Sequence, residues 1–292
     1  MTARATIALA LCGALSGACA TSQQPESEHA GHSAAVAAAA PVNSLPADEA
    51  GALARLTASP RHGEWVTIRT GAQDSIRAWV VYPERKTKAP VVLVVHEIFG
   101  LTPWIRNVAD QLAAEGFLAV APDLLTMKNL PGFPDSVDRQ AAAAAIRTLQ
   151  SVDVQRQLSA IADYATSLPS ATKRYGIVGF CWGGSVSFQH AASSPRLVAS
   201  VVYYGGPPAG GVATVVAPVL GLYGGSDARI NATIPSTDSA MKAAGKTYAY
   251  HIYEGAGHGF LRQQSGMTGA NATATAAAWP ETLAWFRKHL GK

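Results

Sequence analysis

Cysteine is scarce in this chain of 292 residues. There are three, and Cys12 and Cys19 both lie within the first 19 positions. The remainder holds a single thiol, Cys181, and so has no second cysteine with which to form an internal disulfide. A disulfide-stapled fold is therefore excluded, and the lone thiol needs another explanation. It is either an inert core residue or a reactive group.

Charge is also sparse. Asp, Glu, Lys and Arg make up 14% of the residues, and the formal net charge is only +4. The basic residues are scattered and no basic run appears, so a nucleic acid is not expected as a partner. A mildly basic site for an anionic small molecule remains open.

Long apolar runs are missing. The run Ile7–Leu15 follows one basic residue, Arg4, and is too short to span a membrane. We interpret residues 1–20 as a secretory signal peptide. Ala18-Cys19-Ala20 permits cleavage before Thr21, whereas Leu15 to Cys19 is similar to a lipobox and would tether the protein to a membrane through Cys19. Either route predicts a periplasmic or lipid-anchored protein.

Residues 21–60 have low complexity. They contain the alanine run Ala34–Ala40 and several prolines and glutamines, a composition typical of a linker. A short helix over residues 47–56 is conceivable because alanine favours helices. Residues 61–292 then form the folded domain.

The domain alternates strand-like and helix-like segments. An expected hairpin over residues 65–82 is followed by the apolar run Val91–Val95, which is typical of a strand buried on both faces. Helical patterns separate the later strands. This order predicts a single doubly wound α/β domain, with a mostly parallel sheet, helices on both faces and functional loops at the carboxyl ends of the strands.

The thiol lies in such a loop. Gly179-Phe-Cys181-Trp-Gly183 joins a β-rich run to a helical one, which is the pattern of a nucleophile elbow with cysteine in the place of serine. Glycines are needed because strand and helix pass closely. The N-terminus of the following helix should favour the thiolate.

Two later loops carry partner groups. Asp227 follows the run Val219–Tyr223, and His258 follows a strand that ends at Tyr253. Nucleophile, acid and histidine thus appear in the chain order of α/β-hydrolases. We expect His258 to take the thiol proton and Asp227 to orient the imidazole.

The loop after Val95 should complete the site. The backbone N–H groups of Ile98 and Trp182 are the expected oxyanion hole. Glu97 either faces solvent or accepts the thiol proton at rest, thereby protecting the cysteine. His96 is a weaker alternative to His258 as the base, because its place in the chain order is wrong.

Six motifs occur in order from about residue 64 to the C-terminus, and together they are similar to those of the dienelactone hydrolase family. They are His-Glu-Ile-Phe-Gly at 96–100, Ala-Pro-Asp-Leu at 121–124, Gly-Phe-Cys-Trp-Gly-Gly at 179–184, Tyr-Tyr-Gly at 203–205, Gly-Gly-Ser-Asp at 224–227 and Gly-His-Gly-Phe at 257–260. The resemblance implies an α/β-hydrolase fold and a Cys181–His258–Asp227 triad. It also implies that Glu97 pairs with the resting thiol.

The resemblance further implies cofactor-free and metal-free hydrolysis of small cyclic enol esters, often carboxylated ones held by two arginines. Arg262 matches one of these positions. Ala141 stands at the other, so Arg139 would have to reach in from a neighbouring turn or the substrate must differ. We expect a monomer. The open alternatives are a broader esterase or thioesterase, an acyltransferase, and a non-catalytic exported binding protein.

Overall fold

The structure is a computed structural model, and it describes residues 44–291. The predicted signal peptide, Cys19 and the first part of the predicted linker lie outside these residues. Within residues 44–291, none of the helices combines the length and the apolar character that a membrane crossing requires.

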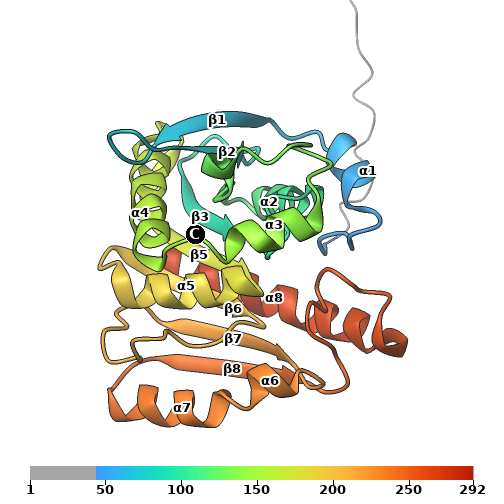
Figure 1. Cartoon of the computed structure of the whole chain (residues 1–292), viewed down its shortest axis with the longest axis vertical. Helices are drawn as coiled ribbons and strands as arrows, with labels where there is room; N and C mark the ends of the chain where they lie inside the picture. Colours follow the sequence, from blue (N-terminus) through green and yellow to red (C-terminus); the bar gives the residue numbers. More distant parts are fainter. Residues whose placement is uncertain (1–43, 292) are drawn as a thin grey trace, which may run out of the picture. The chain divides into compact units, whose positions relative to one another are not determined.

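An eight-stranded sheet forms the centre of the domain (Figure 1). Its strands are β1 Gly63–Arg69, β2 Ser75–Val81, β3 Ala89–Val95, β4 Leu118–Pro122, β5 Ala171–Phe180, β6 Leu197–Tyr203, β7 Val219–Gly224 and β8 Tyr248–Tyr253. The spatial order is β1-β2-β4-β3-β5-β6-β7-β8. Only the pairings of β1 with β2 and of β2 with β4 are antiparallel. The predicted α/β fold is confirmed.

Helices cover both faces of this sheet. They are α1 Ala52–Thr57, α2 Pro103–Ala114, α3 Arg139–Ile146, α4 Ser151–Ser167, α5 Trp182–Ser193, α6 Ala228–Asn231, α7 Ile234–Ala243 and α8 Ala270–Leu290, with 3-10 turns η1 Thr126–Lys128 and η2 Met267–Gly269. Buried residues of α2 and α8 share one core cluster, and those of α4, α5 and α7 share another. Figure 1 shows α5 in front of the strands and α8 behind them.

β3 shows why the sheet needs two layers of helices. All of its residues are buried. Val92 and Val94 belong to the cluster with α2, whereas Leu93 belongs to the cluster with α4. Alternate side chains thus enter opposite cores, and burial of each apolar side chain contributes about 1.5–3 kcal/mol. The continuous apolar run seen in the sequence is explained by this position.

The start of α2 positions the loop after β3. The hydroxyl of Thr102 accepts a hydrogen bond from the backbone N–H of Ile105 at 3.5 Å, and Pro103 occupies the first helical turn. A cap and a proline at this end fix where the helix begins. Residues 96–101 are therefore held between the buried end of β3 and a fixed helix start.

The segment before β1 corrects the predicted boundary at residue 60. Ala52 of α1 is fully buried, and Leu45 packs against the same core as α2. The indole N–H of Trp104 donates to the carbonyl of Ala47 at 3.1 Å. The low complexity of the segment gave no sign of this packing. A few small apolar residues are enough to hold a short segment against a core that other elements have formed.

Candidate active site

Cys181 occupies a strained turn between β5 and α5. Its φ is 56° and its ψ is −115°, a conformation that non-glycine residues rarely adopt. A Cβ atom at Gly179 would lie 1.8 Å from the carbonyl oxygen of Gly183, and one at Gly183 would lie 2.4 Å from that of His96. Both contacts are with backbone and cannot be relieved by a rotamer change. The steric role predicted for the two glycines is confirmed.

The thiol is partly buried and protonated at neutral pH. Burial raises the pKa of Cys181 to about 11, and the charge of Glu97 adds to this rise. The Trp182 backbone N–H and the arginines Arg229 and Arg262 lower it by less. The helix N-terminus thus acts in the expected direction, but desolvation of the thiolate outweighs it.

Asp227 and His258 form a close pair. Oδ2 of Asp227 lies 2.5 Å from Nδ1 of His258. Asp227 is buried and also caps α6, accepting from the Ile230 N–H at 3.4 Å. Since Nδ1–H donates to the carboxylate, Nε2 is left to accept a proton. Within the described chain, no hydrogen bond joins this imidazole to the thiol of Cys181.

Glycine brings the two supporting loops together. A Cβ atom at Gly224, the last residue of β7, would lie 2.5 Å from the carbonyl oxygen of Gly257. The residue before His258 therefore approaches the end of β7 at backbone distance. The Asp227–His258 contact depends on this approach as much as on the two side chains.

His96 is held by both of its ring nitrogens. Nε2 accepts from the Leu124 N–H at 3.2 Å, and Nδ1 lies 2.7 Å from the carbonyl oxygen of Glu97 and therefore carries the proton. The ring is fully buried and stacks on Trp182 at 5.5 Å. His96 thus fixes the loop, and the alternative in which it serves as the base has no free nitrogen to support it.

The expected oxyanion donors are backbone groups at the start of α5 and in the loop after β3. Trp182 is the first residue of α5, and its N–H acts on the thiol sulfur. Ile98 follows Glu97 in the loop, and its N–H has no acceptor within residues 44–291. The close backbone contacts at Gly179 and Gly183 fix the position of the Trp182 N–H. The hydrogen bonds of His96 fix the loop that carries the Ile98 N–H.

Glu97 does not face solvent. Only 3% of its surface is exposed, and Oε2 lies 2.7 Å from Nε of Arg262. Burial raises the pKa of Glu97 to about 7, although the positive charge of Arg262 acts against this rise and Glu49 adds to it. At neutral pH the carboxyl group is therefore close to its titration midpoint.

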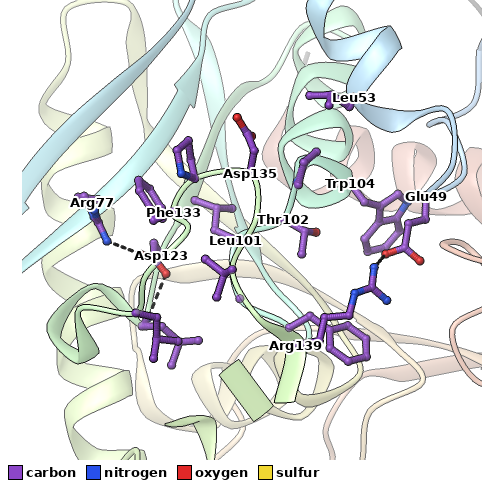
Figure 2. A pocket seen from close by; sticks show the side chains of 17 residues that line it. Glu49, Leu53, Arg77, Leu101, Thr102, Trp104, Asp123, Phe133, Asp135 and Arg139 are labelled. Carbon is purple, nitrogen blue, oxygen red and sulfur yellow. Dashed lines mark hydrogen bonds and ion pairs between the residues drawn. The ribbon is translucent and has the colours of Figure 1, made fainter. Parts of the chain in front are cut away.

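Glu49 joins the two arginines that the sequence singled out. One of its carboxylate oxygens lies 2.6 Å from Nη1 of Arg262, and the other pairs with the guanidinium of Arg139. Both guanidinium groups also lie over the ring of Phe99, at 5.2 Å for Arg262 and 4.9 Å for Arg139. We call Glu49, Glu97, Arg139 and Arg262 the arginine–glutamate cluster. Figure 2 shows Glu49 and Arg139 facing each other.

A cavity of about 220 Å³ adjoins this cluster (Figure 2). Its wall includes Glu49, Arg139, Phe99 and Trp104. Cys181 is not among the lining residues, so this cavity does not lie over the thiol. Trp104 is both core and cavity wall, because it is 1% exposed and lines the cavity.

Tyr204 is a further buried group at the site. Its φ is 40°, and its ring lies 5.0 Å from that of His258. The hydroxyl has no hydrogen-bond partner among the described residues. Burial, followed by the charge of Glu97, raises its pKa well above the ordinary value. The only sequence signal was its place in the Tyr-Tyr-Gly motif.

The structure therefore groups the predicted residues in two sets. Cys181, Glu97 and Arg262 interact electrostatically, and Asp227 pairs with His258. Arg139, half exposed, reaches the first set through Glu49. Glu49 was missed because it lies in the segment interpreted as linker. Within residues 44–291, no group of three or more His, Cys, Asp or Glu side chains is arranged to hold a metal ion.

Comparisons with known proteins agree with this architecture. Residues 76–290 match the family model described as "Dienelactone hydrolase family". A "Putative carboxymethylenebutenolidase" of Methylorubrum extorquens is 33% identical over 236 residues, which cover 76% of this chain and 80% of the relative. A protein of the same name from Yersinia pestis is 32% identical, with 74% and 85% covered.

Solved structures extend the likeness to three dimensions. A "Putative Dienelactone Hydrolase" of Klebsiella pneumoniae superposes with a TM-score of 0.70 at 28% identity, covering 78% of this chain and 99% of that one. A dienelactone hydrolase-like promiscuous phosphotriesterase from metagenomic libraries gives a TM-score of 0.68 at 23% identity, with 79% and 99% covered. The second likeness concerns the fold alone.

Proposed function

The chain belongs to the dienelactone hydrolase family, and from this premise we propose that it cleaves a small ester or lactone with Cys181 as the nucleophile. The observation that carries the proposal is the strained turn at Cys181 together with the Asp227–His258 pair at 2.5 Å. Acyl transfer through a thioester needs a nucleophile, a base and an acid that orients the base, and the proposal assigns these roles to Cys181, His258 and Asp227.

Acylation begins with transfer of the thiol proton to Nε2 of His258. The sulfur attacks the substrate carbonyl carbon, an S–C bond forms, and the carbonyl π electrons move to the oxygen. The N–H groups of Trp182 and Ile98 stabilise this oxyanion. When the intermediate collapses, the ester C–O bond breaks and the leaving oxygen takes the proton from His258. In a lactone the ring opens and both parts stay joined.

Deacylation repeats the sequence with water. His258 accepts a proton from the water, which attacks the thioester carbon. The S–C bond then breaks, the carboxylic acid leaves and the thiolate regains its proton. Asp227 stabilises the imidazolium in both halves, because its carboxylate faces Nδ1–H.

At rest the thiol is kept protonated by its surroundings. With a pKa of about 11, only a small fraction of Cys181 is thiolate at pH 7.5. Glu97 contributes to this state because a carboxylate close to the sulfur disfavours a second negative charge. We propose that substrate binding separates the two groups and brings the thiol within reach of His258.

The substrate class follows from the family and the relatives' name. A carboxymethylenebutenolidase acts on a butenolide, which is a five-membered cyclic ester. A small cyclic ester therefore fits the proposed chemistry, and the cavity of about 220 Å³ beside Phe99 and Arg139 provides room for a compact group.

Turnover of 4-nitrophenyl acetate tests the nucleophile. We expect Cys181→Ala to lower kcat/KM by about 1,000-fold or more, since the acyl-enzyme can no longer form. Ser193→Ala, at the exposed end of α5, is the control and should match the wild type. If Cys181→Ala kept wild-type turnover, Cys181 could not be the nucleophile. A wild-type protein that bound the ester without releasing 4-nitrophenol would contradict the hydrolase mechanism.

A further inference from the structure

We infer that Glu49 is a specificity-determining residue: its carboxylate occupies the arginine pair Arg139 and Arg262 and directs the site toward esters without a negative charge at this end. The inference rests on the proposed function. It concerns a residue of the segment before β1, which lies outside the part matched by the family model, residues 76–290.

The contacts of Glu49 are those that a bound carboxylate would make. Each of its two oxygens pairs with a different arginine, Oε2 with Nη1 of Arg262 at 2.6 Å and Oε1 with Arg139. Two guanidinium groups that share one carboxylate form a strong anion site. The chain itself fills this site.

When both of its carboxyl groups are ionised, the occupied cluster carries no surplus of positive charge. It contains two guanidinium groups, Arg139 and Arg262, and two carboxyl groups, Glu49 and Glu97. A substrate carboxylate that approached it would meet Glu49 at the same two arginines. Without the charge of Glu49, the arginines would outnumber the remaining carboxylate, whose pKa of about 7 leaves it only partly ionised near neutral pH.

The site is close enough to the thiol to affect substrate choice. A Cβ atom at Gly259, the residue after His258, would lie 3.6 Å from Nη2 of Arg262 and 4.0 Å from Oε1 of Glu97. The cluster therefore adjoins the loop that carries the proposed base, and Glu97 and Arg262 both also act on the pKa of Cys181. We expect a substrate held between Cys181 and His258 to extend toward Arg262. A charge on those groups is the feature that Glu49 discriminates against.

The backbone around Glu49 is held independently of its charge. The Glu49 N–H donates to the carbonyl of Arg262 at 2.9 Å, and the Ala47 N–H donates to Oδ1 of Asn107 at 2.9 Å. The side chain of Gln264 donates to the carbonyl of Pro46 at 2.9 Å. Glu49→Gln therefore removes the charge and leaves the segment seated.

Arg139 is open to a ligand from the cavity, whereas the side chain of Arg262 is 9% exposed and is reached at the position that Glu49 now occupies. The side chain of Glu49 is 30% exposed and that of Arg139 is 50% exposed. Both line the cavity beside the cluster (Figure 2). A small carboxylate can enter from this side without displacing the core.

The first test compares a carboxylated ester with its uncharged counterpart. For 4-nitrophenyl hydrogen glutarate and its methyl ester, we expect Glu49→Gln to raise the ratio of kcat/KM values, carboxylated over uncharged, by about tenfold or more. Glu49→Ala should act in the same direction. Glu115→Gln is the matched control, because Glu115, at the end of α2, also pairs with an arginine, Arg287 of α8 at 2.6 Å, and does not belong to the cluster. An unchanged ratio in folded Glu49→Gln and Glu49→Ala would overturn the inference.

The second test does not depend on turnover. In a Cys181→Ala background, calorimetry with sodium benzoate and benzamide should show tighter benzoate binding, by about tenfold, when Glu49→Gln is added, and a gain that shrinks at high salt. An equal gain for benzamide would indicate mere loosening of the segment and would refute a charge effect. If wild-type protein hydrolysed no ester while benzoate binding still rose, the proposed function would fail and the anion site would stand. If wild-type protein hydrolysed the ester and Glu49→Gln did not tighten benzoate binding, only the role of Glu49 would be rejected.

Discussion

The elbow at Cys181 and the arginine–glutamate cluster are neighbours, but they are built in different ways. The elbow is one continuous stretch whose shape is imposed by backbone contacts, such as the 1.8 Å that would separate a Cβ atom at Gly179 from the Gly183 carbonyl oxygen. The cluster combines side chains from four distant segments, around residues 49, 97, 139 and 262.

Because of this difference, we expect the elbow to determine catalysis and the cluster to determine substrate selectivity. A backbone-defined turn tolerates almost no substitution, so it maintains the position of the nucleophile. A cluster of charged side chains can gain or lose a member while the backbone stays in place, as the hydrogen bonds around Ala47 and Glu49 show. We therefore expect changes at the elbow to abolish function and changes in the cluster to tune it.

The largest effect should come from Gly183→Ala. The added Cβ atom would lie 2.4 and 2.5 Å from the backbone oxygens of His96 and Val95. Relief requires movement of β3 or α5, so we expect a loss of about 3 kcal/mol in the free energy of unfolding and of nearly all activity. Urea unfolding measures the first, and 4-nitrophenyl acetate turnover the second. Gly210→Ala, where no atom lies within 4 Å of a Cβ, should be neutral. Equal stability of the two variants would contradict the steric account.

A smaller effect, confined to catalysis, is expected for Asp227→Asn. The amide preserves the cap on the Ile230 N–H, but it no longer stabilises the imidazolium of His258. We expect kcat to fall by about 1,000-fold while the melting temperature changes little. Asp238→Asn, which removes a surface pair with Lys242, is the control. Wild-type kcat in Asp227→Asn would show that His258 needs no carboxylate partner.

The mildest change belongs to the cluster. Glu97→Gln removes a carboxylate that raises the pKa of Cys181, so iodoacetamide should alkylate the thiol several-fold faster at pH 7.5. The gain stays limited because burial, the larger cause, remains. Glu84→Gln, on an exposed turn, should leave the rate unchanged. A slower reaction in Glu97→Gln would mean that the carboxylate activates the thiol and does not protect it.

Glu97→Gln should also change how the free energy of unfolding depends on pH. The pKa of Glu97 in the folded protein is about 7, above the value of about 4.3 for an unfolded chain. Folding therefore favours the protonated form, and the stability that this group contributes is complete below about pH 4.3 and is lost as the pH rises through 7. Glu97→Gln should flatten this part of the stability profile, as measured by urea unfolding between pH 5 and 8.

The sequence alone led to most of the fold and to the elbow. Buried parallel strands appear as continuous apolar runs in the sequence. The glycines beside Cys181 indicate a close approach of strand and helix, so both features can be recognised from a short stretch of sequence. The protonation state of the Cys181 thiol could not be predicted from the local sequence. A helix N-terminus predicted a thiolate, whereas the burial that determines the pKa depends on what the fold packs around the sulfur.

Glu49 marks the limit of sequence reasoning here. Nothing in an alanine-rich, proline-containing stretch indicates that one carboxylate will bridge Arg139 and Arg262, because the partners lie 90 and 213 positions away along the chain. The sequence by itself determined the sheet, the strained turn and the order of Cys181, Asp227 and His258. Tertiary structure decided which charges surround them, because desolvation and ion pairing depend on distances that only folding sets.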